Sequence, residues 1–291
     1  MIDVQADAFL KRINTPQTYS LHTRQAYASD VRSFVHFLHS SAQSVPTLKD
    51  FTSNQVRAYL DQQRQLGLQS STLNRRRASL RRFARYLQAE GLIQKDPTRN
   101  ITTASLDPEA APIVTTVFTP IELQQLDALM AVKPHARSWR DRSILALLLE
   151  TGLMTSRLVD LNVNDFYAEG KRLRLSDQIG DEYRTAIPAS ASVLQAYLER
   201  GRPELAAPDE GALFVSQMGG RMSRQSVWHM LRKWGQIAKI KAEVSPRAIR
   251  NTAVSHMVEA GRTTTEIMNL LGHRNLHSTE ALIRRLKAAK A

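Results

Sequence analysis

The chain of 291 residues contains no cysteine. This absence excludes disulfide bonds, thiolate catalysis and every metal site built on cysteine. Long apolar runs are also missing, because Ile144 to Leu149 is far shorter than the roughly 20 residues of a membrane-spanning helix. The opening stretch "MIDVQADAFL" holds two aspartates and no basic residue, unlike a secretory signal. These absences predict a soluble, cytoplasmic protein without a membrane partner.

Acidic residues are the minority among the charges. Asp and Glu number 27 against 40 Lys and Arg, which gives a formal net charge of +13. Such a charge destabilises the isolated protein by self-repulsion and is typical of a chain with a polyanionic partner. Double-stranded DNA is the partner we expect, with a place in the nucleoid, and an anionic membrane surface is the alternative.

The length and a hydrophobic content of 42% predict two domains with cores of their own. Residues 1–100 show helical apolar spacing, at 20–38, at 53–66 and in a helix capped by Ser71 or Thr72. Residues 101–118 contain two prolines and no helical period, which predicts a linker. Residues 119–291 form the second predicted domain.

The second domain opens on "TPIE", in which Thr119 and Glu122 predict a capping box. The segments "KRLRL" and "YRTAI" alternate in polarity around "QIGDE", which predicts a β-hairpin within residues 161–188. The expected fold class is therefore mainly α with a small antiparallel β-sheet (α+β). The remaining expected helices of this domain cover residues 120–131, 139–151, 190–200, 223–238, 247–260, 263–271 and 279–289.

Two basic clusters predict contact with the DNA backbone. The first lies in "NRRRASLRRFARY", on one helix without an acid before Glu90. A merely solvated outer face is the alternative, although such faces normally mix both signs. Two tryptophans, Trp228 and Trp234, accompany the second cluster and are interpreted as core. The first cluster comprises Arg75, Arg76, Arg77, Arg81, Arg82 and Arg85, and the second Arg221, Arg224, Arg232 and Lys233.

The segment "SPRAIRNTAVSHMVEAGRTTTEIMNLLGHRNLHSTEAL" (245–282) resembles the C-terminal signature of tyrosine site-specific recombinases, the phage-integrase and Xer-type family. "RDRSILALLLETGLMTSRLVDLNVNDF" resembles the first motif of the catalytic domain in that family, and "SSTLNRRRASLRRFARYLQAEGLIQKDPT" its helical core-binding, SAM-like domain. The resemblance implies two domains that form a C-shaped clamp on DNA. It also implies phosphoryl transfer, in which a tyrosine attacks the scissile phosphate and two Arg, a Lys and two His stabilise charge.

When the catalytic positions of the family motifs are compared with this sequence one by one, most of the catalytic residues are missing. The first Arg of the family falls on Met154, the first His on Arg247 and the tyrosine on Leu282. The hairpin stretch "QIGDEY" (178–183) contains no Lys. The positions that match are Arg250 and His273.

This pattern predicts DNA binding without autonomous cleavage, because Leu282 has no oxygen with which to form a covalent link. We expect an accessory, regulatory or architectural factor that needs no cofactor and no metal. Arg247, Arg250, His273 and Arg274 are expected to line a cleft that holds a phosphate. Gly152 is expected to end a helix, with Thr155 or Ser156 capping the next one.

Several alternatives remain open at this stage. A recombinase partner or an unrecognised nucleophile could complete the active site, with Ser278 and Thr279 as the nearest hydroxyls, although capping of the last helix suits them better. The C-terminal helix (279–291) could contact an active recombinase or a second copy through Leu282 and Leu286, or dock within its own chain. Arg157 could replace part of the charge lost at Met154. A decayed gene product without a role is a further alternative.

Overall fold

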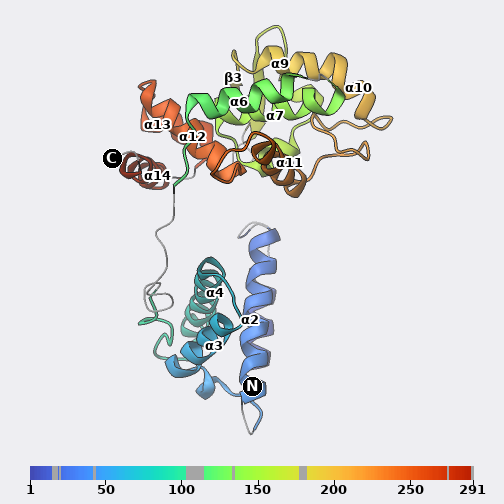
Figure 1. Ribbon diagram of the computed structural model, residues 1–291. Helices are drawn as coiled ribbons and strands as arrows, with labels where there is room; N and C mark the ends of the chain where they lie inside the picture. The colour runs from blue at the N-terminus through green and yellow to red at the C-terminus, as the bar shows by residue number, and fades with distance from the viewer. Residues whose placement is uncertain are drawn as a thin grey trace. The chain divides into compact units, whose positions relative to one another are not determined.

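The computed structural model describes residues 1–14, 19, 21–41, 44–102, 115–132, 135–176, 182–273 and 275–289. The chain divides into two compact units, and the division between residues 112 and 113 falls within the expected linker (Figure 1). Most of residues 101–118 lie outside the described ranges. Mainly helical units with one small antiparallel sheet confirm the expected fold class.

The N-terminal unit is a helical bundle around an aromatic core. Its elements are α1 (Ile2–Ile13), α2 (Leu21–Ser41), the short 3-10 helix η1 (Leu48–Asp50), α3 (Ser53–Gln65) and α4 (Ser70–Ala89). Helix α1 was not expected, although its buried residues Ile2, Ala6, Phe9 and Ile13 recur at helical spacing. The core joins these residues to large buried rings from the other helices, such as Phe34 of α2 and Phe83 of α4.

Helix α4 buries the apolar stripe that its sequence predicts: Leu73, Leu80, Phe83, Ala84 and Leu87. The expected cap was wrong. The helix begins at Ser70 after Gln69, whose side chain makes no capping hydrogen bond. Ser71 and Thr72 therefore lie inside the first turn rather than ahead of it.

The C-terminal unit begins with α6 (Pro120–Val132), α7 (Ala136–Thr151) and α8 (Thr155–Asp160). The expected capping box is present, since Thr119 N–H donates to Glu122 at 2.8 Å and Glu122 N–H donates to Thr119 Oγ1 at 3.3 Å. Gly152 ends α7 in the left-handed conformation, with φ 63°, as expected. Helix α8 is capped by neither Thr155 nor Ser156, because its N-cap residue is Met154.

A three-stranded antiparallel sheet follows, in the order β1 (Phe166–Tyr167), β2 (Arg172–Ser176) and β3 (Glu182–Ala186). Strands β2 and β3 form the expected hairpin, in which Leu173 pairs with Thr185. Strand β1 was not expected, and its Phe166 pairs with Leu173. The tip of the hairpin, residues 177–181, lies outside the described residues.

The remaining helices surround two apolar clusters. They are α9 (Ala191–Ala196), the π-turn η3 (Tyr197–Gly201), α10 (Arg202–Leu205), α11 (Arg224–Ile237), α12 (Pro246–Glu259), α13 (Thr264–Leu271) and α14 (Leu276–Ala288). The larger cluster joins α6, α7, the sheet and α11, and a smaller one joins α12, α13 and α14. Figure 1 shows α12, α13 and α14 at one end of this unit.

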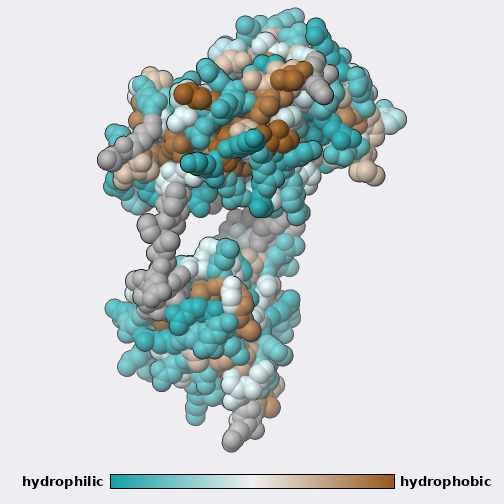
Figure 2. Space-filling view, in the orientation of Figure 1, coloured by the Kyte–Doolittle hydropathy of each residue, from teal (hydrophilic) through white to brown (hydrophobic). Residues whose placement is uncertain are grey.

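Apolar residues also reach the surface of the C-terminal unit. Figure 2 shows brown, apolar atoms across the visible face over α6 and α11. Exposed residues of these helices include Ile121, Val132 and Ile237. Over the described ranges, no helix is both long and apolar enough to cross a membrane.

Candidate functional site

The best-formed part of the expected cleft is the contact between Arg250 and His273. Arg250 comes from α12, and one of its amino groups, Nη1, donates to the carbonyl oxygen of Gly152 at 2.5 Å. The other, Nη2, donates to the carbonyl of Leu271 at 3.2 Å and to Nε2 of His273 at 3.0 Å. Burial and the neighbouring Arg157 lower the pKa of Arg250 to about 10. The guanidinium still carries its charge at neutral pH and is held by uncharged partners.

His273 is held by a hydrogen bond at each ring nitrogen. Arginine has no acceptor, so Nε2 of His273 must accept from Arg250. The proton therefore resides on Nδ1, which lies 2.8 Å from Oγ1 of Thr279. Burial and the charge of Arg250 lower the pKa of His273, which favours this neutral form. Thr279 is fully buried, so its hydroxyl orients His273 instead of capping the last helix.

Arg157 reaches the same corner of the unit. Its guanidinium lies against Gly272, so closely that a Cβ atom on that glycine would overlap it. Met154 is half-buried at the start of α8 and brings no charge. The position that the family motif assigns to an arginine is thus apolar, while Arg157, one turn later, lies near Arg250 and His273.

The other two expected cleft residues are not part of this contact. Arg247 lies exposed in the first turn of α12. Arg274 lies outside the described residues. The structure therefore brings together Arg250 and His273, and it adds Arg157 and Thr279 to them.

Leu282 packs inside its own chain. It is 8% exposed and shares a cluster with Leu271 of α13, Met257 of α12 and Leu286 of α14. Leu286 is 3% exposed, so both leucines belong to the intramolecular core, as in the expected alternative of docking within the chain. The helix begins at Leu276 rather than residue 279, since Asn275 Oδ1 accepts the N–H of Ser278 at 3.0 Å and caps it.

No tyrosine follows Tyr197 in the sequence. Tyr197 itself is fully buried, and burial raises its pKa to about 12. A buried, protonated phenol of this kind is neither accessible nor activated for attack on a phosphate.

The basic residues of α4 divide into an inner and an outer set. The inner set, Arg75 and Arg76, surrounds the buried carboxylate of Asp30 on α2, with Arg75 Nη1 at 2.6 Å. Arg76, only 16% exposed, also donates to Tyr59 at 2.7 Å and to Gln63 at 2.5 Å. We therefore withdraw Arg76 from the expected DNA contacts, because its donors join α4 to α2 and α3.

The outer set of α4 consists of Arg77, Arg81, Arg82 and Arg85, which differ in exposure. Arg82 and Arg85 are exposed, whereas Arg77 and Arg81 are half-buried and donate to the carbonyls of Ile101 and Thr98 at 2.9 and 3.0 Å. Burial and the nearby Arg81 lower the pKa of Arg77. Arg81 and Arg85 also line an open, polar cavity of 1030 Å³. The same cavity is lined by Lys95 and Arg99, two cations that the helical pattern did not point to.

The second basic cluster likewise contains one arginine that holds the fold together and three cations that are exposed on α11. Arg221 donates to the carbonyls of Val159 and Leu161 at 2.6 and 3.0 Å, so it fastens the loop that follows α8. Arg224 and Lys233 are exposed on α11. Arg232 is exposed as well and lies over the ring of Trp228, 5.0 Å from its centre.

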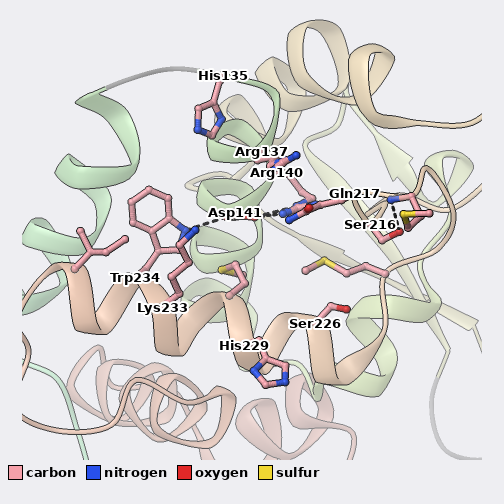
Figure 3. Close-up of a pocket in the computed structure, with 14 residues that line it drawn as sticks. His135, Arg137, Arg140, Asp141, Ser216, Gln217, Ser226, His229, Lys233 and Trp234 are labelled. Carbon is pink, nitrogen blue, oxygen red and sulfur yellow. Dashed lines mark hydrogen bonds and ion pairs between the residues drawn. The ribbon is translucent and has the colours of Figure 1, made fainter.

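Helix α11 also borders a cavity of 510 Å³ with α7 and the loop that holds Ser216 (Figure 3). At its base, Arg140 donates to Asp141 at 2.7 Å, and the indole N–H of Trp234 donates to the other oxygen at 2.9 Å. The bond from Trp234 holds α11 against α7, and Trp234 packs against the core of this unit as expected. Exposed cations at its edge include Arg137 and Lys233.

Metal ligands are not gathered in the described part of the chain. Within those residues, no three His, Asp or Glu side chains are placed to hold a metal ion.

Two family models match the chain. Residues 119–287 match the phage integrase family, and residues 6–91 match the N-terminal SAM-like domain of phage integrases. The first match covers more than half of the sequence, and the chain belongs to the phage integrase family of tyrosine recombinases. This result confirms the resemblance on which the catalytic positions were compared.

Relatives of similar length carry recombinase names. Tyrosine recombinase XerC of Roseiflexus castenholzii is 30% identical, over 95% of this chain and 87% of its own. XerC of Pelobacter propionicus is 31% identical, over 95% and 89%. XerD of Chlorobaculum tepidum is 25% identical, over 94% and 89%.

Solved structures show the same fold at lower identity. The integrase of the transposon Tn1549, in complex with a circular intermediate DNA, aligns with a TM-score of 0.75 at 16% identity, over 96% of this chain and 94% of its own. A lambda integrase dimer bound to a COC′ core site aligns with a TM-score of 0.70 at 16% identity, over 94% and 95%.

Proposed function

We propose that this chain binds double-stranded DNA as a tyrosine recombinase family member that does not cleave DNA on its own. It acts as an accessory, regulatory or architectural factor in recombination. Leu282 carries this proposal: it lies nine residues after His273, where the family motif has its tyrosine, and it is buried in the core between α12, α13 and α14. A leucine has no atom that can form the phosphodiester-breaking covalent bond.

Hydroxyls close to Leu282 are engaged elsewhere. Thr279 is fully buried and bonded to His273, and the hydroxyl of Ser278 donates to Asn275 at 2.9 Å. Neither is presented to solvent as an activated nucleophile. This arrangement disfavours the alternative in which a neighbouring hydroxyl replaces the missing tyrosine.

Charge supports the DNA-binding half of the proposal. Arg77, Arg81 and Arg85 follow one another at four-residue intervals along α4, so their Cα atoms advance about 6 Å per step along the axis. Phosphates form a continuous row along each DNA strand, which suits a row of cations on one helix. Exposed cations on α11 and the outer face of α14 offer further contacts, in particular Arg224, Lys233, Arg284, Arg285 and Lys287. The clamp on DNA expected from the family remains part of this proposal.

The exposed face of α14 also indicates which kind of partner this helix can contact. With Leu282 and Leu286 used internally, the last two turns of α14 expose the cations Arg284, Arg285 and Lys287. Such a surface suits DNA better than a hydrophobic contact with a second recombinase. An active recombinase beside this chain would therefore be engaged through another surface, and the apolar residues over α6 and α11 are the exposed candidates.

A binding titration at several salt concentrations tests the proposal. Fluorescence anisotropy with a labelled duplex should show an affinity that falls steeply with salt, since each neutralised phosphate contributes about −0.9 to the slope of log K against log salt. A library of genomic fragments in the same assay identifies a preferred sequence. Absence of any salt-sensitive or sequence-selective binding would refute the DNA-binding function.

A further inference from the structure

We infer that the cavity between α7, α11 and the loop of residues 216–222 is a docking groove for a partner protein, and that its occupant is an amphipathic helix with an apolar stripe flanked by acidic residues. The groove measures 510 Å³ and lies apart from the contact between Arg250 and His273, neither of which lines it. The inference rests on the accessory role proposed above and adds to it a site for a protein partner, which binds without DNA.

One face of α11 borders the groove over about three helical turns. Its residues recur at positions i, i+3, i+4, i+7, i+8 and i+11, which places them on the same side of the helix. The helix rises about 16 Å from the first of them to the last. The groove therefore extends along α11 for a length that suits a short helix better than a compact small molecule. The face consists of Ser226, His229, Met230, Lys233, Trp234 and Ile237 (Figure 3).

Apolar side chains form much of the wall of this groove. Met222 and Met230 are nearly buried, whereas Met218 on the loop is 91% exposed and Ile237 near the end of α11 is 47% exposed. Methionine side chains adapt their shape to a partner, and covering exposed apolar surface stabilises a complex. An apolar stripe on a bound helix would be buried between these side chains.

The charges around the groove are positive. Among the described residues that line it, Asp141 is the only acid, and its carboxylate is already bound by Arg140 and by the indole N–H of Trp234. Arg137 on α7 and Lys233 on α11 are exposed at its edge, and neither forms an ion pair within the described ranges. The groove thus complements a partner that carries carboxylates beside its apolar stripe.

DNA and the C-terminal helix of a second copy fit this groove less well. Contacts with the DNA backbone use cations and hydrogen-bond donors, so they would leave the exposed Met218 and Ile237 uncovered. Helix α14 exposes Arg284, Arg285 and Lys287, which the cations at the edge of the groove would repel. An acidic amphipathic helix of another protein uses both the apolar walls and the cations.

Two labelled model peptides test the groove in the full-length protein. Each is a helix of about 14 residues with leucines along one face, enough for the turns of the groove, and the flanking residues are glutamates in one peptide and lysines in the other. Fluorescence anisotropy should show at least about tenfold tighter binding of the acidic peptide. The chain has three tryptophans, and NMR should show a shift of the indole N–H signal of Trp234 with the acidic peptide. The signal of Trp228, which does not line the groove, should stay in place.

Two substitutions separate the contributions of charge and apolar surface. Lys233→Met removes a cation, Ile237→Ser removes an apolar side chain, and each should weaken binding of the acidic peptide about fivefold. Their matched controls, Lys239→Met and Ile121→Ser, change exposed residues of the same unit outside the groove and should bind like the wild type. Equal affinity in the wild type, Lys233→Met and Ile237→Ser, or an unmoved signal of Trp234, would overturn the inference.

DNA titrations separate this inference from the proposed function. Ile237→Ser loses no charge, so it should bind DNA like the wild type while its affinity for the acidic peptide falls. A wild type that binds DNA without preferring the acidic peptide refutes the groove and leaves the DNA-binding function standing. A wild type that binds the peptide at the groove and not DNA refutes the proposed function alone. Competition between a DNA duplex and the peptide, or self-association in sedimentation velocity that Ile237→Ser abolishes, would assign the groove to another occupant and overturn the inference.

Discussion

Two groups of arginines in this protein differ in how their charge is balanced. In the N-terminal unit, Arg75 and Arg76 surround the carboxylate of Asp30, which is only 1% exposed. In the C-terminal unit, Arg250 contacts carbonyls and a neutral imidazole, and the charged group that perturbs it is another arginine, Arg157. The first group is balanced by a buried carboxylate, whereas the hydrogen-bond acceptors of Arg250 are two carbonyls and an imidazole.

This difference separates structural from binding cations better than charge density does. All six arginines of "NRRRASLRRFARY" share one helix, yet Arg76 joins the interior while Arg82 and Arg85 face solvent. A guanidinium with an internal carboxylate stabilises the fold, and one that lacks an anion is available to bind one. Four sets of substitutions test this difference between the two groups. They are described in order, from the largest expected effect on stability or DNA binding to the smallest.

Loss of the buried carboxylate of Asp30 should have the largest effect, a decrease in the free energy of unfolding. Asp30→Asn leaves Arg75 and Arg76 without a counter-charge, and we expect about 3 kcal/mol less stability. Denaturant unfolding of the variant and the wild type measures this difference. The control is Asp61→Asn on α3, whose exposed partner Arg64 lies 3.7 Å away and which should change stability by less than about 1 kcal/mol. Equal effects of the two changes would contradict a structural role for the inner arginines.

Removal of the outer cations should act on DNA binding instead. The double change Arg82→Gln and Arg85→Gln should lower the salt slope of DNA binding by up to about 1.8, because each residue is expected to neutralise one phosphate. Stability should stay nearly unchanged, since both side chains are exposed. Anisotropy titrations over a range of salt concentrations measure the slope, with Arg64→Gln as the control. An unchanged slope would exclude this face of α4 from the interface.

Placing an arginine at position 154, where the family motif has one, should have a smaller effect on DNA affinity. Met154→Arg adds a third cation near Arg157 and Arg250, and we expect DNA binding to tighten up to about tenfold, or about 1.4 kcal/mol. No covalent product should form, because Leu282 is unchanged. Restored cleavage in this variant would show that a nucleophile other than tyrosine is present.

A modest pH dependence should arise from His273. Burial and Arg250 lower its pKa in the folded state, so the unfolded chain binds a proton more readily. The stability that this residue contributes is present above its unfolded pKa of about 6.5 and is lost as the pH falls below that value. Unfolding at pH 7.5 and 5.5 should show a smaller acid loss for His273→Gln than for the wild type. His229→Gln, at an exposed site, should leave the loss unchanged.

Local patterns predicted much of the fold and part of the site. Apolar spacing predicted α4 and its buried stripe, and the family motif, counted from His273, predicted Leu282 at the position of the tyrosine. The role of Arg76 was not predictable in this way, because Asp30 lies on another helix and only the packed bundle brings them together. The position of Arg157 depends likewise on Gly272, a residue more than a hundred positions away.

A nicked suicide substrate tests the central claim most directly, because it traps the covalent intermediate of any recombinase that cleaves it. Purified protein is incubated with DNA carrying its preferred site and a nick beside the scissile phosphate, and the mixture is separated on a denaturing gel. We expect a DNA complex on native gels and no covalent adduct on denaturing gels, with a cleaving family member as the positive control. A covalent adduct formed by this protein alone would contradict the account.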